Sequence, residues 1–370
     1  GFSLAESFFV IKTPSQAKTT SRLIDKYRLS KQQIIYIKKG ENEALKIYEA
    51  LGIGDRYRSL AERLDASKSL LYLCARKSNF IGKFDPPENV VCYPFYKVNL
   101  GTQCPFDCAY CYLQLTYRIQ PIPRSYLNLE KLFSELKTLA AKSDRPIVLN
   151  AGELSDPLAL DGDINIVNDV IEEISKYENI KLLLLTKSDK TDHLIDLRDR
   201  RSQVILSASL TSPLNQDRFE RGTASIDERL HSLKVAADKG YRIRVRIDPI
   251  INSHPDWLNS YENGLIKPLV SQIKPELITL GQPRFYSPLL NLASKRFPEQ
   301  NDFWSSIDSK TKDHRIRSSF DERKKVYISI IEMLKDHFGQ GTPDLALCKE
   351  DPDLIRALGI KQKRKCNCLP

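Results

Sequence analysis

The sequence predicts an α/β fold in which a parallel β-sheet closes fully or partly into a barrel. From residue 93 onward, short β-rich runs alternate with amphipathic helical runs about six times. Repeated βα units of this length form parallel strands joined by right-handed crossovers. The chain of 370 residues is 41% hydrophobic and 28% charged, which suits a globular protein with a sizeable core.

The alternation places the expected strands and the helices between them. The expected strands cover residues 93–100, 146–152, 180–187, 203–210, 241–250 and 277–285. The expected helices cover residues 129–141, 164–177, 193–198, 225–240 and 258–273. We expect residues 91–286 to form the barrel, because all the βα units fall within them.

Residues 1–90 are expected to form a small mixed α/β region. Strand-like runs cover residues 7–11, 34–37 and 70–75, with a polar amphipathic stretch after the first and a helix-like run at 41–51. A turn at residues 83–87 separates this region from the barrel. Residues 287–370 are expected to form a C-terminal extension with helices and cysteines.

Charge, hydropathy and cysteine content narrow the class of protein. The 57 Lys and Arg residues exceed the 47 Asp and Glu residues, and the net charge of +10 favours a polyanionic partner such as nucleic acid. No apolar run reaches the ~18 residues of a membrane helix, so we expect a cytoplasmic protein without a membrane partner. Eight cysteines in a chain of this length indicate metal binding or redox chemistry rather than a disulfide scaffold.

Three cysteines form a compact motif directly after the first expected strand of the barrel. Cys104, Cys108 and Cys111 have the spacing C-x-x-x-C-x-x-C. Thiolates select iron–sulfur clusters or zinc, and structural zinc needs a fourth protein ligand that the neighbouring sequence lacks. Three ligands suit a 4Fe-4S cluster whose fourth iron binds a substrate or cofactor. A zinc knuckle completed by a distant ligand and buried structural cysteines are the alternatives.

This motif, with Tyr110 in the aromatic position before the third cysteine, resembles the signature of the radical S-adenosylmethionine enzymes. The resemblance implies two cofactors, a 4Fe-4S cluster and S-adenosylmethionine, whose amino and carboxylate groups chelate the open iron. It also implies cleavage to a 5'-deoxyadenosyl radical and an electron donor such as flavodoxin or ferredoxin. The fold it implies is an open (β/α)6 partial TIM barrel.

Polar residues just past the expected strands are candidate cofactor ligands, because chemistry in parallel α/β folds gathers at the carboxyl ends of the strands. The A-G-E run that ends at Glu153 resembles the G-G-E motif with which the radical enzymes hold the ammonium of S-adenosylmethionine. The same resemblance places Lys187 and Ser209 near its carboxylate or ribose and Asp248 near its adenine. Ser155 is a further candidate for cofactor binding. A helix cap or a loop hydrogen bond is the alternative role for each residue.

A narrower resemblance extends over most of the chain, from roughly residue 68 to residue 338. The matching segments are residues 83–85, 111–114, 186–187, 192–194, 219–223 and 284–285, of which 219–223 are expected to open a helix. In order and spacing these segments resemble spore photoproduct lyase and its relatives. The resemblance implies a DNA-repair lyase that abstracts a hydrogen from a thymine-dimer lesion in DNA and later returns one. DNA or another nucleic acid is therefore the expected substrate class, with DNA favoured.

One departure from that family concerns the returning hydrogen. The lyases resemble A-C-T-S-D after the second strand, where the cysteine donates the hydrogen, and this chain has Glu153 in its place. A carboxylate has no weak bond to hydrogen that it can donate to a carbon radical. Tyr110, Tyr112 and the cysteines near the C-terminus are the candidate donors, unless the reaction differs from dimer splitting.

These C-terminal cysteines are a second departure. Cys348 is followed by a basic run and by Cys366 and Cys368 near the end of the sequence. They are candidates for a second metal site, a redox pair, the missing hydrogen donor or an incidental exposed tail. Two other functions stay open: a radical enzyme that makes C-C or C-S bonds in a small molecule or peptide, and a basic zinc-binding nucleic-acid module.

Overall fold

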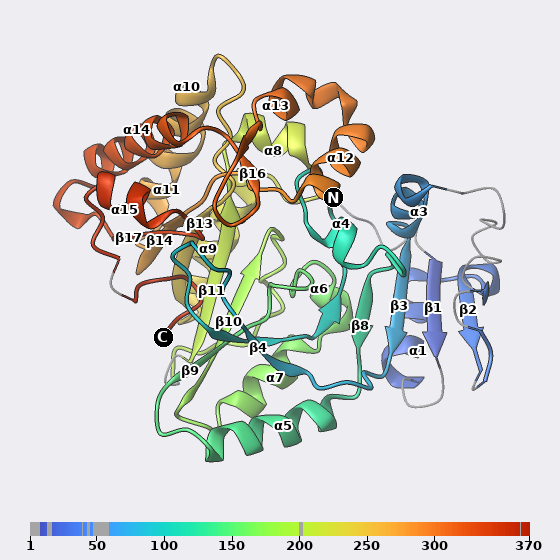
Figure 1. Ribbon diagram of the computed structural model, residues 1–370. Coiled ribbons are helices and arrows are strands. Elements are labelled where there is room, and N and C mark those ends of the chain that lie inside the picture. Colours follow the sequence, from blue (N-terminus) through green and yellow to red (C-terminus); the bar gives the residue numbers. More distant parts are fainter. Residues whose placement is uncertain are drawn as a thin grey trace.

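Two sheets organise the chain, of which the computed structural model describes residues 8–12, 17–38, 40–42, 45–46, 59–199, 203–362 and 364–370. Figure 1 shows the larger, eight-stranded sheet surrounded by helices, with the smaller sheet to one side of it. The strand order of the larger sheet is β17-β14-β13-β11-β10-β9-β5-β4, and only β4 runs antiparallel to its neighbour. Since β4 and β17 are its edges, the sheet is open in the described part of the chain.

The expected strands of the larger sheet are present in the expected order. They are β5 (Phe95–Val98), β9 (Ile147–Asn150), β10 (Ile180–Thr186), β11 (Val204–Leu210), β13 (Arg242–Ile247) and β14 (Leu277–Leu280). Two strands were not expected in this sheet, β4 (Ile81–Phe84) and β17 (Asp344–Leu347). β17 adds a further parallel strand beside β14, and its 4 residues are too few to give a clear periodic pattern of apolar residues.

Helices on the outer face of this sheet follow the sequence pattern in most places. Helices α5 (Leu129–Ala141) and α9 (Ile226–Asp238) lie where predicted, and α9 starts with a capping box between Ser225 and Glu228. The expected helix at 164–177 divides into α6 (Asp161–Ile164) and α7 (Val167–Ile174). The expected helix at 258–273 divides into α10 (Trp257–Tyr261), a π-helical turn (Glu262–Ile266) and α11 (Lys267–Gln272).

The helix predicted at residues 193–198 is wrong, because these residues form turns and irregular backbone. Leu194 and Leu197 are both buried, and their spacing of three residues imitates a helical pattern. The backbone of Leu197 instead donates a hydrogen bond of 2.8 Å to the carbonyl oxygen of Lys239, at the end of α9. A hydrogen bond to the end of α9 therefore satisfies the backbone amide of Leu197 without a helix.

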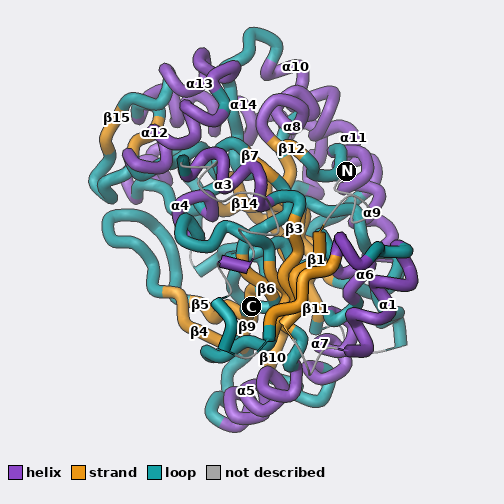
Figure 2. The backbone as a smooth tube through the Cα atoms, turned by 90° about the vertical axis from the view of Figure 1, so that its right-hand side faces the viewer, coloured by secondary structure: helices purple, strands orange, loops and turns teal. Residues whose placement is uncertain are grey.

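The smaller sheet has the order β2-β1-β3-β8-β6. Figure 2 views the molecule from the side on which this sheet lies. Its strands are β1 (Phe8–Lys12), β2 (Ile34–Ile37), β3 (Leu70–Cys74), β6 (Gly101–Thr102) and β8 (Arg124–Tyr126). The two sheets are not divided at residue 90. Strands β6 and β8 follow that residue and belong to the smaller sheet, whereas β4 precedes it and belongs to the larger sheet. The polar stretch after β1 forms α1 (Ala17–Tyr27), whereas most of the helix-like run at 41–51 lies outside the described residues.

Shorter elements and the C-terminal helices complete the described structure. The helices are α3 (Leu60–Ser67), α4 (Leu113–Thr116), α8 (Pro213–Phe219), α12 (Ser287–Arg296), α13 (Asn301–Ser305), α14 (Phe320–Phe338) and α15 (Pro352–Ala357). The short strands are β7 (Asp107–Cys108), β12 (Glu220–Arg221), β15 (Ser309–Lys310) and β16 (Ile316–Arg317). Of the helices described, none combines the length and apolar character needed to cross a membrane.

Successive side chains of the parallel strands face two different environments. Those that pack against the helices are apolar, as in Leu182, Leu206 and Val245 of the main hydrophobic core. Those on the opposite, inner face are largely polar, and many of them are buried. This inner set includes Asn150, Ser207, Ser209, Arg244 and Arg246. The larger sheet therefore presents a polar inner face, on which a site for charged ligands can form.

Candidate active site

A cavity of about 670 Å³ lies at the carboxyl ends of the parallel strands. One wall is the cluster loop, residues 104–111, from which all three motif cysteines line the cavity. The other walls come from residues just past the strands. The sequence-predicted residues that line the cavity are Tyr110 and Tyr112, in and beside the cluster loop, and Glu153, Ser155, Lys187, Ser209 and Asp248, at the strand ends. The fold thus brings these candidates to one place, whereas Cys348, Cys366 and Cys368 are not among the residues that line it.

Backbone contacts hold the cluster loop in position. Lys68 Nζ donates hydrogen bonds of 2.8 Å to the carbonyl oxygens of both Cys104 and Phe106. Strand β7 in the loop pairs antiparallel with β12, which places Cys108 opposite Glu220. The prediction that residues 219–223 open a helix is therefore corrected: Phe219 ends α8, Glu220 and Arg221 form β12 against the loop, and α9 begins only at Ile226. Pairing with a distant segment decided this conformation.

The buried thiols suit a positively charged metal cluster. Burial raises the pKa of Cys104 to about 12 and the pKa of Cys108 well above its ordinary value. The protein alone therefore disfavours the thiolates, and bound iron would stabilise them. In the described residues, no three His, Cys, Asp or Glu side chains come together around one metal ion. A four-iron cluster does not need such convergence, because its thiolate ligands bind different irons.

Glu153 lies on the loop after β9, where a close approach of two backbones requires glycine. A Cβ atom at Gly152 would lie 2.5 Å from the carbonyl oxygen of Leu185. Asn150 holds this turn, since its Oδ1 accepts from the Gly152 amide at 2.8 Å and its Nδ2 donates to Glu153 Oε1 at 3.1 Å. The carboxylate is therefore aimed by a neighbouring amide and keeps its second oxygen for a ligand on the cavity side.

Asp156 joins that loop to the end of the next strand. Its carboxylate accepts hydrogen bonds of 2.7 Å from the Thr186 hydroxyl and from the Lys187 backbone amide. Burial raises the pKa of Asp156 above its ordinary value, although these hydrogen bonds oppose the shift. Ser155, immediately before it, lines the cavity. The loop from Glu153 to Asp156 is thus fixed to β10 rather than left to move.

Lys187 and Glu220 form the charged centre of a second wall. Lys187 Nζ donates to Ser209 Oγ at 3.0 Å and lies 3.8 Å from Glu220 Oε1. The Tyr110 hydroxyl donates to the same Glu220 oxygen, and Arg229, which is fully buried, pairs with the other at 2.5 Å. Burial alone would raise the pKa of Glu220, but Arg229 and Lys187 lower it below its ordinary value.

The two candidate tyrosines differ in their surroundings. Burial, and then the neighbouring Glu220 charge, raise the pKa of Tyr110 well above its ordinary value, so its phenol keeps its proton. Tyr112 is 46% exposed, and its hydroxyl donates to the backbone carbonyl of Glu153. Both rings line the cavity beside the cysteines. Each therefore presents an O–H group within the same space.

Two arginines that hold Asp248 at the cavity wall were not among the sequence-predicted site residues. Arg246 Nη2 and Arg284 Nη2 bind Asp248 Oδ2 at 2.6 and 3.0 Å. Burial alone would raise the pKa of Asp248, but the two guanidinium groups hold it well below its usual range. The signal for Arg246 was the alternation of arginines at 242, 244 and 246 within one strand, which puts them on the same face. Arg284 has no comparable local signal.

The C-terminal tail, residues 364–370, lies on the inner face of the larger sheet. Ser207 Oγ of β11 donates to Asn367 Oδ1 at 3.1 Å, and Arg244 Nη1 of β13 donates to the Asn367 carbonyl at 2.8 Å. Cys368 Sγ accepts a hydrogen bond of 3.4 Å from Asn150 Nδ2. Both views place the C-terminus beside β9 (Figure 1, Figure 2). The tail is therefore built into the fold, beneath the cavity rather than across its mouth.

The open parallel sheet and the three-cysteine loop at its carboxyl edge define a protein of the radical S-adenosylmethionine class. Comparison with protein families identifies it further, because residues 58–339 match the model for spore photoproduct lyase. The chain belongs to the spore photoproduct lyase family.

Individual members of the family have low sequence identity to this chain. The spore photoproduct lyase of Geobacillus sp. (strain Y412MC61) is 29% identical over 210 residues, which are 55% of this chain and 61% of that protein. The lyase of Bacillus subtilis (strain 168) is 26% identical over 238 residues, 63% of this chain and 67% of that protein. The alignment thus spans about three fifths of the Geobacillus relative.

Solved structures of spore photoproduct lyase share the fold. One, complexed with dinucleoside spore photoproduct, has a TM-score of 0.72 at 20% identity and covers 94% of this chain and 98% of its own. A mutant with bound AdoMet and dinucleoside spore photoproduct has the same TM-score and identity, with coverage of 92% and 97%. The likeness therefore includes the N-terminal region and the C-terminal extension as well as the barrel strands.

Proposed function

We propose that this protein is a radical S-adenosylmethionine enzyme that acts on a photoproduct in nucleic acid, with DNA as the favoured substrate. The observation that carries the proposal is the convergence of three cysteines and the strand-end polar residues in one cavity. Family membership supports it, as do the ligands named for the solved relatives, AdoMet and dinucleoside spore photoproduct. The fold we propose for the site is the open (β/α)6 partial barrel.

Cys104, Cys108 and Cys111 are proposed to hold a 4Fe-4S cluster. When bound, the cluster supplies the electron that cleaves S-adenosylmethionine to a 5'-deoxyadenosyl radical, with flavodoxin or ferredoxin as a suitable electron donor. The loop gives its thiols an ordered position through Lys68 and β12. A cytoplasmic location belongs to the same proposal.

The strand-end residues are proposed to position S-adenosylmethionine. Glu153, aimed by Asn150, accepts charge-assisted hydrogen bonds from the ammonium group. Lys187 and Ser209, which lie 3.0 Å apart, are placed to meet the carboxylate or the ribose. Ser155 contributes a hydroxyl, and Asp248 lines the side proposed for the adenine, where two arginines fix its carboxylate.

The cavity also contains cationic and aromatic side chains of the kind that nucleic-acid sites use. Lys349 Nζ lies 4.6 Å from the centroid of the Phe84 ring, and Arg315 lies 5.2 Å from the centroid of the Tyr286 ring. All four residues line the cavity, and Tyr286 is 50% exposed. Cationic groups bind phosphate, and exposed aromatic rings stack on bases. These pairs favour a nucleotide lesion over a small apolar substrate.

Tyr110 and Tyr112 are proposed as the catalytic residues that carry hydrogen to the substrate radical. Glu153 stands where the lyases have their donor cysteine and has no suitable hydrogen to give. Both tyrosines are protonated phenols at the cavity wall, and Tyr112 is hydrogen-bonded to the backbone of Glu153 itself. The substitution at this position also favours a second candidate function, a family relative with different radical chemistry.

Product analysis tests the proposed function directly. The protein is incubated without oxygen with S-adenosylmethionine, a reductant and DNA that carries thymine photodimers. We expect 5'-deoxyadenosine to form and the dimers to revert to thymines, as measured by chromatography of hydrolysed DNA. The Cys104→Ala variant is the control and should form neither product. Cofactor cleavage with every photodimer intact would contradict the proposed reaction and support the second candidate.

Replacement of Glu153 by Gln should weaken the binding of S-adenosylmethionine. The variant keeps the size of the side chain but loses a charge-assisted hydrogen bond worth about 1.5–3 kcal/mol, so the Kd should rise about 10- to 100-fold. Isothermal titration of the anaerobic protein measures this. Glu130→Gln, at an exposed position of α5, is the matched control and should leave the Kd unchanged. An unaltered Kd in folded Glu153→Gln protein would refute the assignment.

A further inference from the structure

Four cysteines outside the cluster loop lie on three segments that the fold brings together. They are Cys92, Cys348, Cys366 and Cys368, and all four are free thiols. The Tyr93 hydroxyl donates a hydrogen bond of 2.8 Å to the Gln362 carbonyl, which joins the first segment to the start of the tail. The Gln362 side chain exchanges two hydrogen bonds of 2.8 Å with the Leu347 backbone, and Val91 bridges to Glu350. Each segment is thus attached to the other two.

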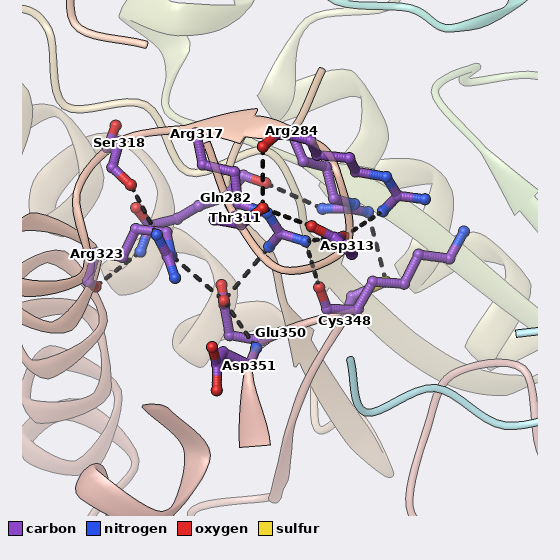
Figure 3. A network of polar contacts seen from close by, with 12 residues as sticks. Gln282, Arg284, Thr311, Asp313, Arg317, Ser318, Arg323, Cys348, Glu350 and Asp351 are labelled. Atoms are coloured by element: carbon purple, nitrogen blue, oxygen red, sulfur yellow. Dashed lines mark hydrogen bonds and ion pairs between the residues drawn. The ribbon is translucent and has the colours of Figure 1, made fainter. Parts of the chain in front are cut away.

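The sulfur atoms lie among hydrogen-bond donors rather than in an apolar core. Cys348 Sγ accepts from Arg246 Nη2 at 3.1 Å and from Arg284 Nη2 at 3.5 Å. Arg284 and Cys348 belong to the polar network drawn in Figure 3. Cys368 Sγ accepts from Asn150 Nδ2 at 3.4 Å. A buried cysteine without a function usually packs as a small apolar residue. Nitrogen donors directed at sulfur are instead typical of the surroundings of metal-bound cysteine.

A buried amide beside these thiols lacks a partner. Asn367, between the two tail cysteines in the sequence, is only 1% exposed, and its Nδ2 has no hydrogen-bond acceptor among the described residues. Its Oδ1 is satisfied by Ser207, so the side chain is held in this orientation. An unsatisfied buried N–H is unfavourable by about 1–3 kcal/mol, and N–H groups commonly donate to the sulfur atoms of metal clusters. The orphaned amide is thus an independent sign of an additional acceptor at this place.

We propose that Cys92, Cys348, Cys366 and Cys368 hold a second metal centre, separate from the one at the cluster loop. Four thiolates select a soft metal and complete either a four-iron cluster or a tetrahedral zinc site. No three of these sulfurs converge on a single-ion position within the described structure, which favours the larger iron–sulfur cluster. The guanidinium groups of Arg246 and Arg284 offset the negative charge of such a centre.

The proposed centre has a defined place in the molecule. It attaches the C-terminal tail to the inner face of the sheet, beneath the cavity. Arg246 and Arg284 contact Cys348 on one side and Asp248 of the cavity wall on the other. The two arginines therefore connect the second centre to the wall of the proposed active site.

Metal analysis of a variant without the first site tests the proposal. The triple variant Cys104→Ala/Cys108→Ala/Cys111→Ala is purified without oxygen, and its iron, sulfide and zinc are measured together with its native mass. We expect it to retain about four iron and four sulfide, or one zinc, per chain. Adding Cys366→Ala and Cys368→Ala should remove this metal, whereas adding Cys74→Ala, in β3, should not. A triple variant without iron or zinc, or tail substitutions without effect on metal content, would overturn the second centre.

A thiol count on the folded triple variant covers the case in which the tail substitutions prevent folding. Metal-bound cysteines should resist a thiol reagent until a chelator or acid releases the metal, after which about four further thiols react. Immediate reaction of all four thiols, or a mass lower by two hydrogens that indicates a disulfide, would contradict metal binding. The readout needs no substrate, so it is independent of whether the proposed DNA reaction is correct.

Discussion

Replacement of Cys104 by Ala should abolish the cleavage of S-adenosylmethionine. The same result is expected for Cys108→Ala and Cys111→Ala, because the three cysteines line one cavity and each would ligate a different iron of the proposed cluster. Each variant should lose the iron of this centre, about four atoms per chain. Iron and sulfide analysis and the yield of 5'-deoxyadenosine with a chemical reductant measure the two effects.

Cys74→Ala provides the control for these variants, since Cys74 is a buried cysteine of β3 and does not line the cavity. It should keep full iron content and cofactor cleavage even if it lowers stability slightly. If all three cluster-loop variants kept the full iron content of the wild type and still cleaved S-adenosylmethionine, the radical-generating site would have to lie elsewhere.

Replacement of Arg229 by Met should cause a large loss of stability. Its guanidinium is fully buried, pairs with Glu220 at 2.5 Å and also donates to the carbonyl oxygens of Ala224 and Ser209. The variant would leave the Glu220 carboxylate buried with only Lys187, 3.8 Å away, as a charged partner. Removing one partner of a buried pair destabilises a protein by about 3–5 kcal/mol. Urea denaturation of the metal-free protein measures the change.

Two further variants show whether the effect comes from the unpaired charge. Arg229→Met combined with Glu220→Gln should be more stable than Arg229→Met alone, because the second change removes the uncompensated carboxylate. Arg198→Met breaks an exposed ion pair with Asp196 and should leave the denaturation midpoint almost unchanged. An Arg229→Met variant as stable as the wild type would mean that the pair does not hold this wall together.

Some residues of the candidate site can be predicted from local sequence patterns, and others cannot. The spacing of Cys104, Cys108 and Cys111 lies within one loop, and the polar residues Glu153 and Lys187 directly follow apolar strands. Both signals are local, and the rule that parallel strands gather their carboxyl ends then predicts a shared site. Arg284, which contacts Asp248 across the cavity, has no such signal because its partner is 36 residues away.

The sequence by itself determined the order of the parallel strands along the chain, the position of α5 and α9, and the cysteine motif, because the period of apolar residues and the spacing of ligands are local properties. Only the tertiary structure decided that residues 193–198 form no helix, that β17 extends the sheet and that Glu220 and Arg221 pair with the cluster loop. It also decided that the tail lies inside the fold, where Ser207 and Arg244 bind Asn367. These features depend on hydrogen bonds and packing between segments that lie far apart in the sequence, and a single sequence carries no periodic trace of such contacts.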